Sequence, residues 1–122
     1  MPKGQQPPTY LINLDRSADR LARMSAEADQ YGFTFERVRG VDGAKEVPEW
    51  LSEQFVVDTA MSSGEIGCYA SHMTVWKRVR DQRLDYAIVL EDDAEVRGGF
   101  ADARGAAGQD HVRARPRRPA RC

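Results

Sequence analysis

Residues 10–38 read YLINLDRSADRLARMSAEADQYGFTFERV, and this stretch decides the fold. It opens with a short apolar run that predicts a buried strand over Tyr10–Leu14. Ser17 is a suitable N-cap for a following helix. Apolar residues then recur at helical spacing: Leu21, Met24, Ala28 and Tyr31. Gly32 predicts the end of this helix, and Phe33–Val38 resembles a second strand in composition. Together they predict a βαβ unit.

The same alternation continues along the chain. Residues 40–43 (GVDG) predict a tight loop, and Pro48 predicts the first turn of a short helix. Residues 55–57 fit a strand or a helix end equally well. Ser62–Glu65 has the form of a capping box before an amphipathic helix. Its predicted apolar stripe is Ile66, Tyr69, Ala70, Met73 and Trp76. Trp76 lies on this stripe, and both Trp50 and Trp76 are expected in the core. The apolar run Tyr86–Leu90 predicts a strand in the middle of a parallel sheet. The fold class is α/β.

Composition places the chain among small proteins of one domain. It has 122 residues and a net charge of −1, which favours neither nucleic acid nor an anionic surface as a partner. Cys68 and Cys122 suggest neither a disulfide framework nor a zinc site, and a reducing compartment is the simpler expectation. The N-terminus lacks the apolar stretch of a signal peptide, so we expect a cytoplasmic protein.

Residues 97–122 differ from the rest of the chain. They contain no Leu, Ile, Met, Tyr or Trp, and their seven Arg against two Asp give +5, while residues 1–96 carry −6. Such a segment cannot bury enough apolar area to offset its ordering entropy, so we expect disorder. The expected organisation is a flexible leader over 1–9, a folded portion over 10–96 and a tail over 97–122. Because only three of the 18 basic residues are Lys, a frameshift in a GC-rich gene is one hypothesis for the tail.

The strongest chemical signal is the acidic motif Glu91–Asp93, directly after the last apolar strand. In open α/β sheets ligands bind at the carboxyl ends of strands. Adjacent carboxylates repel one another, and Mg²⁺ or Mn²⁺, which prefers oxygen ligands, relieves that repulsion. A solvated strand end explains the motif about as well. A receiver domain of two-component signalling does not fit, because 85 residues precede the strand that leads into the motif and no Lys follows the motif.

Two further segments carry polar residues at predicted helix starts. Arg16 and Arg20 follow the first strand and suit a phosphate or nucleotide, although a solvated first turn with ion pairs is slightly favoured by pattern alone. Residues 63–72 (SGEIGCYASH) place two glycines where a backbone or ligand can approach closely. His72 is more often a structural residue than a catalyst in such a setting.

Four motifs in this order resemble glycosyltransferase family 25: YLINLDRSADR (10–20), RGVDG (39–43), SGEIGCYASH (63–72) and DYAIVLEDD (85–93). That family includes bacterial lipopolysaccharide and lipooligosaccharide galactosyltransferases and collagen galactosyltransferases. The resemblance covers residues 10–96 and implies part of a GT-A, Rossmann-like fold that binds a UDP-sugar with Mn²⁺ or Mg²⁺.

The resemblance also implies roles for individual residues. Asp93 is the expected metal ligand, and Glu91 and Asp92 are expected to bind the ribose or support the metal. The residues expected around the nucleotide are Asn13, Arg16, Arg20 and Asp42. The implied reaction transfers a hexose, galactose by resemblance, to a lipopolysaccharide or oligosaccharide acceptor. Peripheral association with the inner face of the membrane is compatible with such a glycolipid acceptor.

The similarity to the family stops near Val96, before the part that would supply an acceptor site and a general base. We therefore expect this chain to lack turnover by itself and to be marginally stable or to self-associate. The alternative is a non-enzymatic α/β module whose basic tail binds nucleic acid or an anionic surface, although nucleic acid is the less favoured partner.

Overall fold

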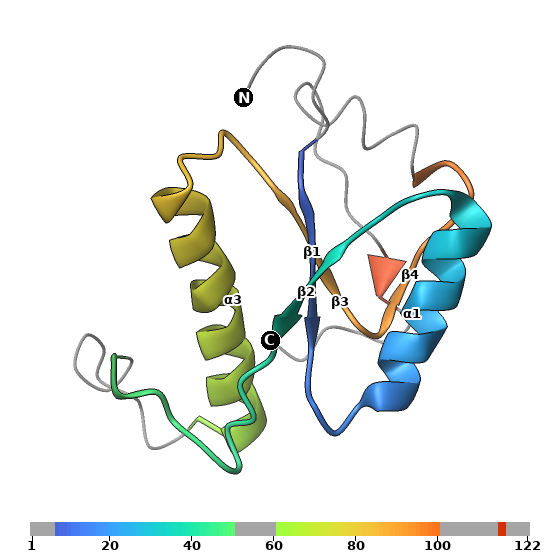
Figure 1. Cartoon of the computed structure of the whole chain (residues 1–122). Coiled ribbons are helices and arrows are strands. Elements are labelled where there is room, and N and C mark those ends of the chain that lie inside the picture. Colours follow the sequence, from blue (N-terminus) through green and yellow to red (C-terminus); the bar gives the residue numbers. More distant parts are fainter. Residues whose placement is uncertain (1–6, 51–60, 101–114, 117–122) are drawn as a thin grey trace.

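The computed structural model describes residues 7–50, 61–100 and 115–116, which form a small α/β structure (Figure 1). Its main elements in chain order are β1 (Thr9–Asn13), α1 (Ala18–Tyr31), β2 (Glu36–Arg39), α3 (Ser63–Asp81) and β3 (Ile88–Glu91). A separate antiparallel pair joins β4 (Ala94–Glu95) to β5 (Arg115–Pro116). The predicted α/β fold class is confirmed, and each predicted strand in residues 10–90 is present with bounds shifted by one to three residues at either end.

The sheet has the order β2-β1-β3, and both pairings are parallel. The central strand β1 is buried on both faces, because Tyr10 is 1% exposed and Leu11 is 0% exposed. Among the described strands β3 lies at an edge of the sheet, where Val89 is 37% exposed. The prediction that this last strand lies in the middle is therefore wrong for the described residues. A continuous apolar run cannot tell the two positions apart, because the pairing order depends on the whole topology.

Helices α1 and α3 lie on opposite faces of this sheet (Figure 1). On one face Leu11 and Leu90 pack with Met24 and Ala28 of α1. On the other face the buried residues are Tyr10, Val38 and Val75. Alternate residues of β1 thus serve the two layers, as the side-chain period of a strand requires. This arrangement brings the carboxyl ends of all three strands to one edge.

The helix ends follow the sequence signals with one difference. Gly32 ends α1 in the left-handed conformation at φ 71°, and the side chain of Ser62 caps α3 by accepting a hydrogen bond from the Glu65 N–H at 3.1 Å. Ser17 occupies the N-cap position of α1 but makes no capping hydrogen bond with its side chain. Its carbonyl oxygen instead accepts from the side chain of Asn13 at 3.0 Å.

The predicted buried face of α3 is confirmed at Ala70, which is 0% exposed, but it is wrong at Tyr69, which is 41% exposed, and at Trp76. Trp76 is 70% exposed, and the buried residues of this helix are Gly67, Ala70, Ser71 and Val75. Small residues on this face allow a close approach to the neighbouring loop, so packing selects them over the larger apolar side chains. Trp50 is half-buried, with the Lys77 ammonium 3.6 Å from its ring centroid.

The ordered structure extends past residue 96. Phe100 is 7% exposed, and its ring meets that of Phe33 edge to face with centroids 4.9 Å apart. The segment expected to be a disordered tail therefore begins inside this core cluster, so the expectation of disorder is wrong for residues 97–100. One aromatic side chain suffices to anchor this short segment. Residues 55–57, most of the leader and most of the tail lie outside the described residues. Neither described helix is long and apolar enough to cross a membrane.

Candidate functional site

A pocket of about 950 Å³ opens at the edge where the parallel strands end. The pairing of Ile12 with Glu91 brings the end of β1 beside the acidic motif, although some 80 residues separate them in sequence. The start of α1, the loop after β2 and the start of α3 complete the walls. Six of the seven predicted site residues line the pocket: Arg16, Arg20, Asp42, Glu91, Asp92 and Asp93. Asn13 does not, because it lies beneath the surface at 1% exposure.

Asp92 is held in place from several sides. Asn13 Nδ2 donates to its Oδ2 at 2.9 Å, and Arg20 Nη1 donates to its Oδ1 at 3.2 Å. Its main-chain carbonyl accepts a hydrogen bond from Arg23. The residue is 8% exposed, so these contacts compensate the burial of its charge. Asp92 therefore forms part of the framework that supports the acidic motif.

Arg23 is a pocket residue that the sequence reasoning missed. Its guanidinium lies between Glu27 Oε1 at 2.7 Å and the carbonyl oxygen of Ala94 at 3.4 Å, and it also reaches the carbonyl of Asp92. It thereby fixes the backbone of the turn that carries Asp93. The spacing of Arg20 and Arg23, three residues apart on one face of α1, was the available signal.

Glu91 faces α3 from the end of β3. His72 Nε2 lies 3.4 Å from Glu91 Oε1, and this hydrogen bond lowers the pKa of Glu91 against the opposing effect of burial. Cys68 Sγ lies 3.6 Å from the same oxygen, and the three side chains could together resemble a metal-ligand cluster. However, Cys68 is disulfide-bonded, so its sulfur is no thiolate ligand here.

Asp93 differs from its two acidic neighbours. It is half-buried and lines the pocket. Its carboxylate makes no hydrogen bond or ion pair with any residue in the described ranges 7–50, 61–100 and 115–116. Within the described part of the chain, Asp93 is therefore the carboxylate of the motif whose oxygens stay available to a ligand.

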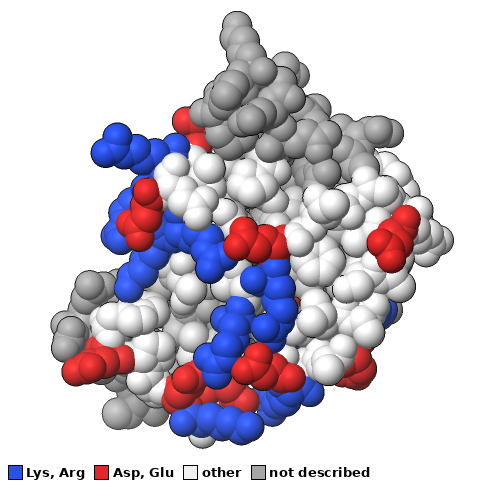
Figure 2. Space-filling model, viewed as in Figure 1, with Lys and Arg blue, Asp and Glu red and all other residues white. Residues whose placement is uncertain are grey.

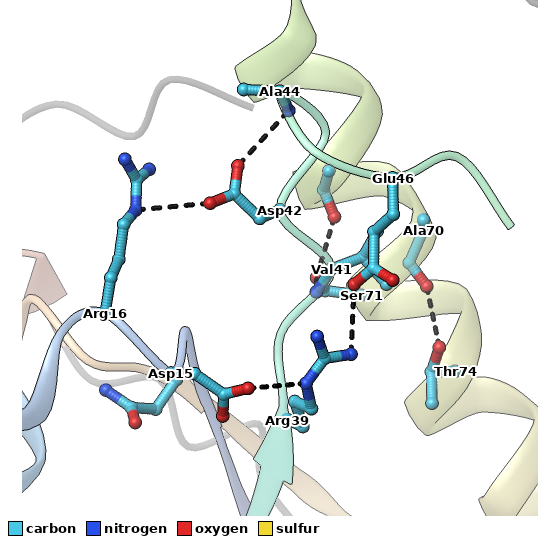
Figure 3. Close-up of polar contacts among 12 residues, drawn as sticks. Asp15, Arg16, Arg39, Val41, Asp42, Ala44, Glu46, Ala70, Ser71 and Thr74 are labelled. Carbon is cyan, nitrogen blue, oxygen red and sulfur yellow. Dashed lines mark hydrogen bonds and ion pairs between the residues drawn. The ribbon is translucent and has the colours of Figure 1, made fainter.

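The loop after β2 is fixed tightly against α3, which places Asp42 at the pocket. The Val41 N–H donates to Ser71 Oγ at 2.8 Å (Figure 3). A Cβ added to Gly43 would lie 1.9 Å from the carbonyl oxygen of Ser63, so only glycine fits there. Asp42 accepts from the Ala44 N–H at 3.2 Å with one oxygen and pairs with Arg16 Nε at 3.4 Å with the other (Figure 3).

Charges on the pocket wall do not cancel. The basic side chains are Arg16, Arg20 and Arg23, and the acidic ones are Asp42, Glu65, Glu91, Asp92 and Asp93. With His72 neutral, three positive and five negative charges leave −2. Arg16 and Arg20 are the solvent-exposed cations of this set, because their side chains are 63% and 51% exposed. On the face shown in Figure 2, basic and acidic side chains of the described residues also lie next to one another.

Comparison with known proteins agrees with these features. The sequence profile of the family described as "Glycosyltransferase family 25 (LPS biosynthesis protein)" matches residues 6–112. A "Glycosyltransferase 25 family member" of Anopheles gambiae is 32% identical over 84% of this chain and 20% of that protein. "Procollagen galactosyltransferase 2" of Mus musculus is 32% identical over 75% of this chain and 16% of that protein. "Inactive glycosyltransferase 25 family member 3" of Mus musculus is 26% identical over 75% of this chain and 17% of that protein. The chain thus spans a fifth or less of the length of these relatives.

Proposed function

Because this chain belongs to glycosyltransferase family 25, we propose that its pocket binds the nucleotide part of a UDP-sugar together with a divalent cation. The proposed reaction is the transfer of a hexose to a glycan acceptor. Galactose is the proposed sugar, since a relative 32% identical is named a procollagen galactosyltransferase. The family description names lipopolysaccharide biosynthesis, which supports a glycolipid or oligosaccharide acceptor.

The observation that carries the proposal is the charge of the pocket. Its wall has a net charge of −2, and the diphosphate of a sugar nucleotide is itself an anion. Two anionic partners repel one another at short range in a partly buried site. A hard divalent cation that binds carboxylate oxygens removes this repulsion. The carboxylate of Asp93, which has no partner among the described residues, is of the right chemical type. When bound, Mn²⁺ or Mg²⁺ would act as a Lewis acid that stabilises charge on the leaving diphosphate.

The remaining residues have separate proposed roles. Asp93 holds the cation, and Glu91 supports that site or contacts the ribose. Arg16 and Arg20, which are the exposed cations of the wall, turn from their carboxylate partners toward the phosphates. Since guanidinium groups bind carboxylate and phosphate in similar geometry, this exchange of partners needs no new backbone conformation. Asp42, held by its tight loop, keeps Arg16 at the mouth of the pocket until the ligand arrives.

Binding rather than turnover is the direct test, because one relative, 26% identical, is named inactive and this chain spans only part of its relatives. Calorimetry should detect UDP binding that requires Mn²⁺ and disappears with a chelator. Asp93→Asn should weaken this binding at least about tenfold, since a cation ligand is lost. Glu95→Gln is the matched control, because Glu95 is exposed and does not line the pocket. UDP binding of equal strength in a chelator would overturn the proposal.

A further inference from the structure

The side chain of Asn13 has all of its polar atoms engaged below the pocket. Its Nδ2 donates to Asp92 Oδ2 at 2.9 Å and to the Ser17 carbonyl at 3.0 Å. Its Oδ1 accepts from Arg37 Nε at 3.0 Å. Because an amide has two donor hydrogens and one acceptor oxygen, these three contacts use both N–H groups and the oxygen. Asn13 therefore acts on the acidic motif and does not reach a ligand in the pocket.

Arg37 determines which way this amide points. A guanidinium can only donate hydrogen bonds, so the amide oxygen must face Arg37 and the NH₂ group must face Asp92. In the reversed orientation the NH₂ group would face the guanidinium and the amide oxygen would face the carboxylate, and both contacts would be repulsive. Arg37 also hydrogen-bonds to the main chain of Asn13, because its Nη2 donates to the carbonyl oxygen of Asn13 at 3.1 Å. The two contacts together fix both the position and the polarity of the amide.

Arg37 is itself held at the edge of the sheet. Asp15 Oδ1 accepts from Arg37 Nη2 at 2.7 Å, while Asp15 Oδ2 accepts from Arg39 Nε at the same distance. The path therefore runs from Asp15 through Arg37 and Asn13 to Asp92. Arg39 shares the Asp15 end of the path and, within the described part of the chain, does not hydrogen-bond to Asn13, although it pairs with Glu46 at 3.0 Å (Figure 3).

We propose that Arg37 is a positioning residue that acts through Asn13 to hold the Asp92 carboxylate, and with it the turn that presents Asp93 to the pocket. The proposal rests on the function proposed above for the pocket. It adds a residue of β2 that lies outside the pocket wall. A lysine would not replace Arg37, since its single ammonium lacks the fork that reaches Asn13 and Asp15 together.

The test is hydrogen exchange of the Asn13 side-chain amide, followed in ¹⁵N–¹H spectra of the whole chain. In the wild type this buried amide should exchange slowly. Arg37→Met should accelerate exchange about tenfold, which corresponds to the loss of one buried hydrogen bond. Arg39→Met is the matched control and should leave the rate unchanged, because it removes an Asp15 partner of the same charge. Equal rates in the wild type and Arg37→Met, or equal acceleration by both variants, would overturn the proposal.

Asp15→Asn covers the case in which Arg37→Met fails to fold. Asp15 is exposed, so this substitution spares the core, and loosening Arg37 should accelerate exchange of the Asn13 amide by a smaller factor. No acceleration would contradict the proposed path.

A second readout tests the consequence for ligand binding. Arg37→Met should weaken Mn²⁺-dependent UDP binding about threefold to tenfold, while Arg39→Met should not. If the wild type binds no UDP, the proposed function fails while the exchange rates still decide whether Arg37 orients Asn13. If exchange accelerates while UDP affinity stays constant, Arg37 orients the amide without serving the ligand, and the positioning role is wrong.

Discussion

Gly67 of α3 lies directly against the carbonyl oxygen of Val41, and a Cβ built on Gly67 would stand 2.5 Å from that oxygen. The same loop is tied to the helix through Ser71, whose Oγ accepts from the Val41 N–H at 2.8 Å and donates to the Gly67 carbonyl at 2.7 Å. Backbone therefore packs on backbone here, and the contact fixes the loop that carries Asp42.

Gly67→Ala should lower the free energy of unfolding by about 1–3 kcal/mol, because the loop must move away from the new methyl group. This loss should exceed the gain of up to about 1 kcal/mol that alanine brings to a helix interior. Chemical denaturation measures the difference. Gly64→Ala is the matched control, since a Cβ there would meet nothing closer than 3.9 Å. Equal stability of the two variants would show that the loop does not depend on this contact.

Trp76 and Val75 are neighbours in α3, but one side chain is exposed and the other is buried. Truncating the smaller, buried Val75 should therefore lower stability more than truncating the larger, exposed Trp76. Val75→Ala should cost about 1–3 kcal/mol, because Val75 is 2% exposed and its loss leaves a cavity. Trp76→Ser should change stability by no more than about 0.5 kcal/mol, since the tryptophan is 70% exposed. Thermal or chemical unfolding of both variants checks this. A larger loss for Trp76→Ser would mean that its ring is covered in solution.

These two residues also show where sequence reasoning reaches its limit. The βαβ unit, the Gly32 helix end and the Ser62 cap follow from local rules, and the structure contains all three. The buried face of α3 does not follow from local rules. Apolar residues lie on more than one side of that helix, and tertiary packing selects the side with small residues. Trp76 was therefore misplaced.

The location of the candidate site could likewise be predicted from the sequence, but some of its contacts could not. The carboxyl ends of parallel strands meet at one edge of a sheet. The sequence therefore suffices to predict that the residues after β1 and β3 lie close together. Burial of Asn13 and the contacts of Arg37 could not be foreseen. They depend on the register between β1, β2 and β3 and on side-chain directions that no local pattern encodes.

Asp15 provides a prediction of pH dependence. Its hydrogen bonds with Arg37, and then with Arg39, hold the pKa of this carboxyl below its ordinary value of 3.8. A carboxyl with a lowered pKa in the folded state adds stability above its unfolded pKa, and this contribution is lost as the pH falls through the folded value. The relevant window therefore lies below about pH 4. Because Asp15 is fully exposed, only the direction is predicted.

Arg37→Met and Arg39→Met should each raise the pKa of Asp15, and Arg37→Met should have the larger effect. A ¹³C titration of the Asp15 carboxyl measures both shifts. Arg78→Met is the control, because Arg78 pairs with Glu36 at 3.0 Å and not with Asp15. An Asp15 titration that is the same in all three variants would contradict the two hydrogen bonds.

Asp92 and Asp93 are adjacent, but we assign them different roles: Asp92 supports the fold, and Asp93 binds the ligand. Replacing each by alanine should therefore affect stability differently. Asp92→Ala removes the acceptor of a buried N–H of Asn13 and the partner of Arg20, so it should cost about 1–3 kcal/mol of stability. Asp93→Ala removes a carboxylate without a partner among the described residues and relieves repulsion from its neighbours. It should therefore change stability by no more than about 0.5 kcal/mol. Denaturation in metal-free buffer gives the comparison, and a reversed order of the two losses would mean that Asp93, not Asp92, supports the fold.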